Sequence, residues 1–154
     1  MFHVYLIAEV KIMRFSEGSL GRFFVCRLNY ESDLLDSIKG FADDKGVKVA
    51  VFFLLGAVKK ARFSFYDQEE KKYVEDEIEE AMEVLSCIGN IAKMKGETIV
   101  HGHIVLSDRK GKSCGGHLRN GTIVFSAELF IMELKGTVLE REYDEVTGLN
   151  LFKL

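Results

Sequence analysis

One segment of this chain has the residue spacing of an amphipathic helix, and a single helix restricts the folds that the rest can adopt. Its apolar residues recur every three or four positions: Leu34, Leu35, Ile38, Phe41 and Ala42. That spacing places them on one buried face. Ser32 and Asp33 are suited to cap the amino end, and Gly46 is suited to end the helix in a left-handed conformation. We therefore predict one principal helix over about residues 32–45.

Most other segments are rich in valine, isoleucine, phenylalanine and tyrosine, which favour strands. The predicted strands cover residues 2–13, 23–28, 47–58, 61–66, 98–106, 115–119, 122–134 and 149–154. Residues 59–60 are predicted to join the third and fourth strands, and residues 108–112 and 120–121 predict two hairpin turns. The pattern predicts an α+β fold, in which an antiparallel meander packs against the helix, as a single compact domain over residues 1–154.

The segment 69–92 gives conflicting signals. Its run of glutamates and lysines favours a helix on propensity alone. Residues 84–88 form a short apolar run, and Gly89 and Asn90 interrupt the pattern directly after it. Composition and periodicity leave helix and strand open for this segment.

The overall composition is that of an ordinary globular protein, with 47% hydrophobic and 29% charged residues. The formal net charge is -3, so the chain lacks the basic excess by which dedicated nucleic-acid-binding proteins neutralise phosphates. Two basic segments are weak candidates for nucleic-acid contacts: Lys59, Lys60 and Arg62, and Arg109, Lys110 and Lys112. Taken singly, each is better explained as a solvated turn that protects a sheet edge.

The cysteines and the apolar runs indicate where such a chain resides. The three cysteines are widely spaced, with no Cys-x-x-Cys pair, which predicts a reducing compartment, the cytoplasm, and no disulfide framework. The first ten residues lack the positive leader and the cleavage site of a signal peptide. The longest apolar run, 49–58, is about half of the ~20 residues that cross a bilayer. We therefore expect no membrane partner.

Three of the four histidines occupy positions that a hairpin would bring together. His101 and His103 alternate along one predicted strand, so they point to the same face. If the turn is centred near Lys110, His117 lies opposite His103, with Cβ atoms about 4.5–5.5 Å apart. Three imidazoles so placed suit zinc, which binds nitrogen at ~2.0–2.1 Å and can keep a fourth position open to water. We predict a zinc site at these three histidines.

Other residues near this hairpin are weaker candidates. Cys114 stands three positions before His117, so on a regular strand it points to the opposite face, unless a bulge at the intervening glycine pair reverses it. Asn90 and Glu128 are candidates to accept the second N–H of a ligating histidine. The alternative interpretation is a hydrogen-bonded histidine cluster at a contact between subunits.

The order of these segments resembles that of the plants-and-prokaryotes-conserved domain. The similarity is carried by residues 83–92, 100–108 and 115–118, with support from residues 27–28 and 55–57 and from Glu128, Arg141 and Asp144. The resemblance implies a small α+β fold in which residues 83–92 are mainly extended, usually assembled as a homotrimer. It also implies that His101, His103 and His117 form the metal site of the family.

The resemblance is less informative about function. Plant members join the domain to an AT-hook, an Arg-Gly-Arg-Pro motif that enters the minor groove of DNA, whereas this chain contains no proline. The first hypothesis is a homotrimeric binding or assembly module, with DNA or a regulatory protein as candidate partners. The alternatives are a zinc-dependent hydrolase or lyase, with Glu128 or Glu83 as general acid or base, and a small-ligand sensor. No motif for a nucleotide or organic cofactor is present, and the sequence favours a binding protein over an enzyme.

Overall fold

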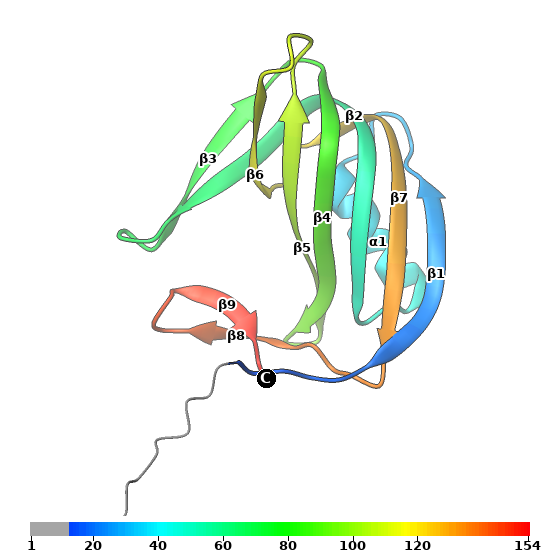
Figure 1. The fold of residues 1–154 in the computed structure, drawn as a ribbon, viewed down its shortest axis with the longest axis vertical. Coiled ribbons are helices and arrows are strands. Elements are labelled where there is room, and N and C mark those ends of the chain that lie inside the picture. Colours follow the sequence, from blue (N-terminus) through cyan, green and yellow to red (C-terminus); the bar gives the residue numbers. More distant parts are fainter. Residues whose placement is uncertain (1–12) are drawn as a thin grey trace, which may run out of the picture.

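An antiparallel sheet of seven strands organises residues 13–154, the part of the chain that this computed structural model describes (Figure 1). Its strands are β1 (Ser19–Arg27), β2 (Ala50–Asp67), β3 (Lys72–Ile78), β4 (Met82–Met94), β5 (Glu97–Ser107), β6 (Ser113–Leu118) and β7 (Ile123–Lys135). Their order in the sheet is β1-β7-β2-β4-β5-β6, and β3 pairs with the second half of β2. A separate hairpin follows, made of β8 (Arg141–Asp144) and β9 (Leu149–Phe152).

The predicted helix is confirmed as α1 (Leu34–Lys45), which lies behind the sheet in the view of Figure 1. The Asp33 side chain caps its amino end by accepting the Asp36 N–H at 2.9 Å. Gly46 ends the helix with φ 63°, a left-handed conformation that glycine adopts without steric cost. Its buried residues, Leu34, Ile38 and Ala42, belong to the hydrophobic core. The α+β fold class of one compact domain is therefore confirmed.

The long strand β2 is continuous, so the predicted turn at residues 59–60 is wrong. Its first half lies between β4 and β7, and its second half pairs with β3 and contacts β6. Register shifts opposite β7, between Ala57 and Lys60, mark the change of partners. Two lysines fit within a strand here because Glu31 pairs with Lys59 and Glu77 pairs with Lys60.

The segment with conflicting signals is also extended. Residues 72–78 form β3, and β4 confirms the extended conformation expected for residues 83–92. Helix propensity does not prevail in β3 because its alternate glutamates, Glu75 and Glu77, form ion pairs with Arg62 of β2. This cross-strand pairing depends on partners distant in sequence, which local propensity does not include.

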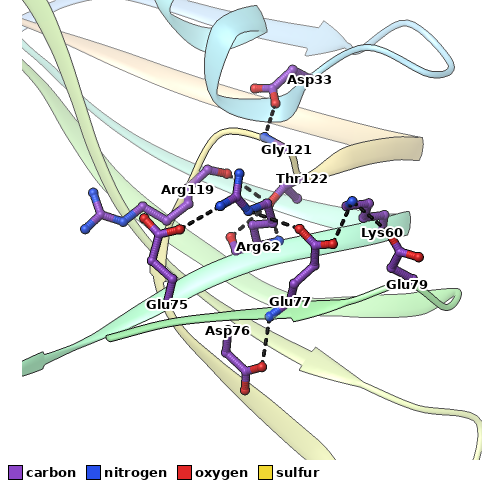
Figure 2. A network of polar contacts seen from close by, with 10 residues as sticks. All are labelled: Asp33, Lys60, Arg62, Glu75, Asp76, Glu77, Glu79, Arg119, Gly121 and Thr122. Carbon is purple, nitrogen blue, oxygen red and sulfur yellow. Dashed lines mark hydrogen bonds and ion pairs between the residues drawn. The ribbon is translucent and has the colours of Figure 1, made fainter. Parts of the chain in front are cut away.

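Residues 120–121 do not form the predicted hairpin. β4, β5 and β6 do form a meander, and residues 108–112 make the expected turn. After β6 the chain crosses to the other side of β2, where β7 pairs with β1 and β2. Polar contacts hold this crossing (Figure 2): the Gly121 N–H donates to Asp33 Oδ2 at 2.6 Å, and the Arg62 N–H donates to Thr122 Oγ1 at 3.1 Å. The turn thus links the start of α1 to β2.

The two faces of the sheet differ in what covers them. One row of paired residues, the inner row, faces α1: Cys26, Leu129, Leu54, Cys87, Ile104 and Gly116. The adjacent row, the outer row, points to the opposite face: Val25, Phe130, Phe53, Ile88, His103 and His117. Val25 is 68% and Ile88 60% exposed, so the apolar part of the outer row is open to solvent.

Two further predictions concern the ends of the chain and the membrane. The strand predicted over residues 2–13 lies almost wholly outside the described residues, and Met13 precedes β1 without regular structure. The strand predicted near the carboxyl end is confirmed as β9. Within residues 13–154, no helix has both the length and the hydrophobicity needed to cross a bilayer.

Candidate metal centre

Three histidines converge at the end of the outer row. His103 lies directly opposite His117 in the β5–β6 ladder, which is the register that the turn predicted, and His101 shares their face. The ring centroids lie 4.8–5.5 Å apart, and one ring nitrogen from each lies within 4.8 Å of the others. Within residues 13–154 this is the one group of three side chains identified that could hold a metal ion together.

The donor set fits a metal that prefers nitrogen ligands. Imidazole suits zinc, copper, iron and nickel. A tetrahedral zinc ion with Zn–N bonds of ~2.0–2.1 Å holds its nitrogens roughly 3.3 Å apart. Side-chain rotation can close the present spacing to that value, because the two strands already place all three rings on one face. His103 is exposed and the other two are half-buried, so the cluster is accessible from solvent.

Two of the histidines are neutral at neutral pH. Burial, together with the nearby Arg141 and His103, lowers the pKa of His101 to about 4. Burial also lowers the pKa of His117 to about 4, with contributions from His101 and Arg119. A neutral imidazole has a free lone pair on one ring nitrogen, which is the form that a metal binds. The protein environment therefore favours the ligating form of these side chains.

Arg141 of β8 contacts the cluster through His101. Its Nη2 donates to Asn90 Oδ1 at 2.9 Å and contacts His101 Nδ1 at 3.1 Å, and Nη1 donates to the Asn150 carbonyl at 2.8 Å. Its Cζ lies 4.4 Å from the ring centroid of Phe152. Because a guanidinium can only donate, Nδ1 of His101 is the acceptor and the ring proton lies on Nε2. Asn90, predicted to support a histidine directly, instead accepts from Arg141.

A cavity of about 770 Å³ opens beside the histidines. Residues of β2, β3, β6 and β9 line it, so it involves both the β2–β3 hairpin and the β8–β9 hairpin. Arg119 is fixed in its wall: Nε donates to Ser64 Oγ at 2.9 Å, and Cζ lies 4.1 Å from the ring centroid of Tyr73. The Tyr73 and His117 ring centroids are 5.0 Å apart. The histidine cluster is therefore continuous with a space large enough for a small molecule.

The remaining predicted site residues lie away from the cluster. Glu128 is on β7, and β2 and β4 stand between that strand and β5. Glu83 pairs with Ser107 at the far end of β5. Cys114 pairs with Leu106 in a ladder without a register shift, so it points away from His117 as a regular strand requires.

The glycines near the cluster make room for packing. A Cβ on Gly89 would lie 2.5 Å from Phe52 Cζ and 2.2 Å from the His101 carbonyl oxygen. Gly102, its partner in the ladder, would bring a Cβ to 3.1 Å from the same ring atom. These glycines therefore shape the sheet around Phe52.

All three candidate nucleic-acid contacts on β2 form ion pairs with glutamates. Lys60 pairs with Glu77 at 2.8 Å and Glu79 at 2.9 Å, and Arg62 pairs with Glu75 at 2.6 Å (Figure 2). Lys59 pairs with Glu31 in the same way. The second candidate group, Arg109, Lys110 and Lys112, is exposed in the β5–β6 loop. Of the two basic segments suggested as nucleic-acid contacts, only this loop presents side chains without an ion-pair partner among the described residues.

Two arginines and a tyrosine of the site were not predicted from the local pattern. Arg119 stands two residues after His117, and Tyr73 faces that histidine from β3. The period of two along a strand could have indicated Arg119. Arg141 had no such signal in the local pattern, because β8 lies outside the sheet; only the family resemblance included it, without a role.

Comparison with known proteins agrees with this architecture. The chain is similar to the structure of a metal-containing protein from Archaeoglobus fulgidus, with 38% identity and a TM-score of 0.88 over 92% of this chain and 100% of that one. It is also similar to a plant- and prokaryote-conserved protein from Pyrococcus horikoshii, with 34% identity and a TM-score of 0.86 over 92% and 98% of the two chains.

Sequence comparison gives a relative and a family. The chain is 29% identical over 133 residues to the bifunctional protein GlmU of Synechococcus sp. (strain JA-3-3Ab), covering 85% of this chain but 20% of that protein. It thus spans about a fifth of the length of that relative. The sequence profile of the Plants and Prokaryotes Conserved (PCC) domain matches residues 15–135, which include α1, the sheet and all three histidines. The chain therefore belongs to the Plants and Prokaryotes Conserved domain family.

Proposed function

We propose that this protein is a homotrimeric binding module in which His101, His103 and His117 hold a zinc ion in each chain. The observation that carries the proposal is the convergence of the three imidazoles on one face, with nitrogens within 4.8 Å of one another. Two of them are neutral at neutral pH and ready to bind a metal. The similar protein from Archaeoglobus fulgidus, described as metal-containing, adds support.

Zinc is the metal we favour because the site offers only imidazole ligands. Three histidines form an open zinc site in which a fourth position remains for water or another ligand. No carboxylate or thiolate belongs to the group of ligating side chains. Hard cations such as magnesium and calcium, which prefer oxygen ligands, fit this donor set poorly.

The homotrimer is supported by the apolar outer face. Val25, Phe53 and Ile88 stand in one row that leads to His103, and Phe23 and Leu55 expose further apolar area beside it. An apolar area of this kind on one face commonly marks an interface. Copies of this chain can cover it by closed symmetry, and the family resemblance favours three copies.

Native mass spectrometry of the full chain, supplied with zinc and desalted, tests both parts of the proposal. The expected result is a trimer carrying about one zinc ion per chain. The His103→Ala variant should lose the zinc, whereas His3→Ala, which removes the one histidine that the proposed site does not use, should retain it. A monomer under these conditions would contradict the assembly, and equal zinc content in both variants would contradict the site.

A further inference from the structure

The cavity beside the histidines carries positive charge without a carboxylate to balance it. Arg119 and Arg141 both line it, and no aspartate or glutamate of the described residues does. Neither arginine belongs to any ion pair found within residues 13–154. In a chain of net charge -3 this is a local reversal of sign. An unbalanced pair of guanidiniums in a cavity favours an anionic ligand.

The contrast with Arg62 shows that the two arginines differ from the basic residues elsewhere. Arg62 donates to Glu75 and Glu77 on the neighbouring strand, as Figure 2 shows. Arg119 instead contacts a hydroxyl and an aromatic ring, Ser64 Oγ and Tyr73. These neutral contacts fix the position of its guanidinium and leave its charge uncompensated.

Arg141 has a donor that nothing in the chain uses. Its Nε is buried and lacks a hydrogen-bond partner, which is the one such side-chain atom among the described residues. A buried, unpaired charged donor costs free energy unless a ligand or water satisfies it. Arg141 is anchored by Asn90, Asn150 and Phe152, so it cannot swing freely toward bulk solvent.

A metal at the histidines would release a second donor on the same arginine. Nδ1 of His101 now accepts from Arg141 Nη2. If His101 bound a metal through Nδ1, that lone pair would be used. If it bound through Nε2, Nδ1 would carry the proton and become a donor. Either way Nη2 loses this acceptor, and three neutral imidazoles leave the charge of the metal uncompensated beside two guanidiniums. A bound oxyanion would supply both an acceptor for the Arg141 donors and a negative charge that balances the metal and the two guanidiniums.

The rest of the cavity wall indicates what the anion is attached to. Tyr66 and Tyr73 form an aromatic pair with ring centroids 4.9 Å apart, and both line the cavity. Leu149 and Leu151 of β9 line it as well. A volume of about 770 Å³ exceeds what an inorganic ion needs and lies in the range of small-molecule sites. An organic molecule with an apolar body suits this wall.

We propose that the cavity binds a small organic oxyanion, a carboxylate or a phosphate, whose charged group is held by Arg119 and Arg141 and directed toward the histidines. The strengthening of this binding by zinc rests on the proposed function, but the contribution of the arginines does not. This proposal names the class of ligand that the binding module would take. The parts of the cavity wall that β8 and β9 contribute lie after residue 135, where the family match ends.

Isothermal titration calorimetry with benzoate and with phenyl phosphate, on the full chain with zinc and after chelator treatment, tests the proposal. Benzyl alcohol, which has the same ring without the charge, should not bind. Binding of benzoate alone, or of phenyl phosphate alone, would identify the carboxylate or the phosphate as the preferred group. Binding of both would indicate a general oxyanion site.

The variants separate the arginines from the metal. Arg119→Gln and Arg141→Lys should each weaken anion binding about tenfold or more, because each removes a charge-assisted or bidentate contact. Arg109→Gln, which removes the same charge from the exposed β5–β6 loop, should leave the affinity unchanged. Circular dichroism should confirm that every variant is folded.

The outcomes distinguish this inference from the metal proposal. If zinc binds and neither anion does, the inference fails and the metal site stands. If zinc does not bind but an anion does, and Arg119→Gln removes that binding, the metal proposal fails and the inference stands. Binding that Arg119→Gln and Arg109→Gln leave equally strong would overturn the inference with or without zinc.

Discussion

The inner and outer rows of the sheet lie one residue apart along the same strands, yet they serve different purposes. The inner row is closed by α1, and Leu129, Leu54, Cys87 and Ile104 are at most 2% exposed. In the outer row, Phe53 is 39% and Ile88 60% exposed, and the row ends in His103 and His117. A step of one residue thus separates side chains that stabilise the fold from side chains available for binding.

Among the described residues, the sheet is therefore packed along its whole width on one face only. Within residues 13–154, the inner face packs against α1, whereas the outer face is covered near the histidines by the β2–β3 and β8–β9 hairpins and leaves Val25 and Ile88 exposed. The apolar end of the outer face therefore suits a second copy, and the histidine end suits a metal and a ligand.

Ile104→Ala should destabilise the chain by about 3 kcal/mol, because it leaves a cavity in the inner row. Val105→Ala, one residue further on the outer face, should cost less than about 1 kcal/mol. Urea unfolding followed by circular dichroism measures both values. Equal costs for the two variants would mean that the outer face is as well packed as the inner one.

Gly89→Ala should destabilise the chain by about 2 kcal/mol, since the added methyl group meets Phe52 and the His101 carbonyl and the sheet must shift. Gly40→Ala in α1 is the matched control, because its Cβ would meet nothing within 4 Å. That control should be neutral or slightly stabilising. Thermal unfolding of the two variants decides whether the glycine in the sheet is a packing requirement.

Ionised Glu133 should contribute to the unfolding free energy, and this contribution should be lost at acid pH. It is the one charged residue that is buried among those described, and hydrogen bonds from Arg22 lower its pKa to about 2. A lowered pKa means that the unfolded chain binds the proton more readily, so this contribution is present above about pH 4.5 and is lost as the pH falls toward 2. Glu133→Gln should flatten the decline measured by urea unfolding between these limits. If the unfolding free energy of the variant fell as steeply as that of the wild type, titration of other groups would cause the loss of stability.

Ile88→Asp should leave the isolated chain folded, with a change in unfolding free energy of roughly 0.5 kcal/mol or less, because the side chain is exposed. The proposed trimer should dissociate, since a charge would enter the apolar contact that we infer for it. Sedimentation at matched concentrations measures the mass, with Lys110→Asp as the control outside the outer row. A trimeric Ile88→Asp variant would place the interface elsewhere.

The parts of the fold that sequence reasoning predicted are those specified by neighbouring residues. Asp33 and Gly46 fix the ends of α1, and the turn after β5 fixes the register that opposes His103 to His117. Each of these depends on residues that lie close together in the chain. Local chemistry was sufficient there.

The parts that it missed depend on distant partners. From local sequence alone Lys60 is predicted to lie in a turn, and propensity alone favours a helix for β3. The structure differs because Glu77 of β3 forms ion pairs with Lys60 and Arg62 of β2. In the same way Arg141 reaches His101 from a hairpin 40 residues later in the chain. Such contacts have no signature in local composition, so the place of Arg141 beside His101 required the structure.

X-ray absorption at the zinc edge, on the full chain loaded with zinc, tests the metal centre most directly. We expect about three imidazole nitrogens at ~2.0–2.1 Å and one further light-atom ligand. His103→Ala should abolish that signal. A sulfur ligand or an all-oxygen shell would contradict the assignment of the site to His101, His103 and His117.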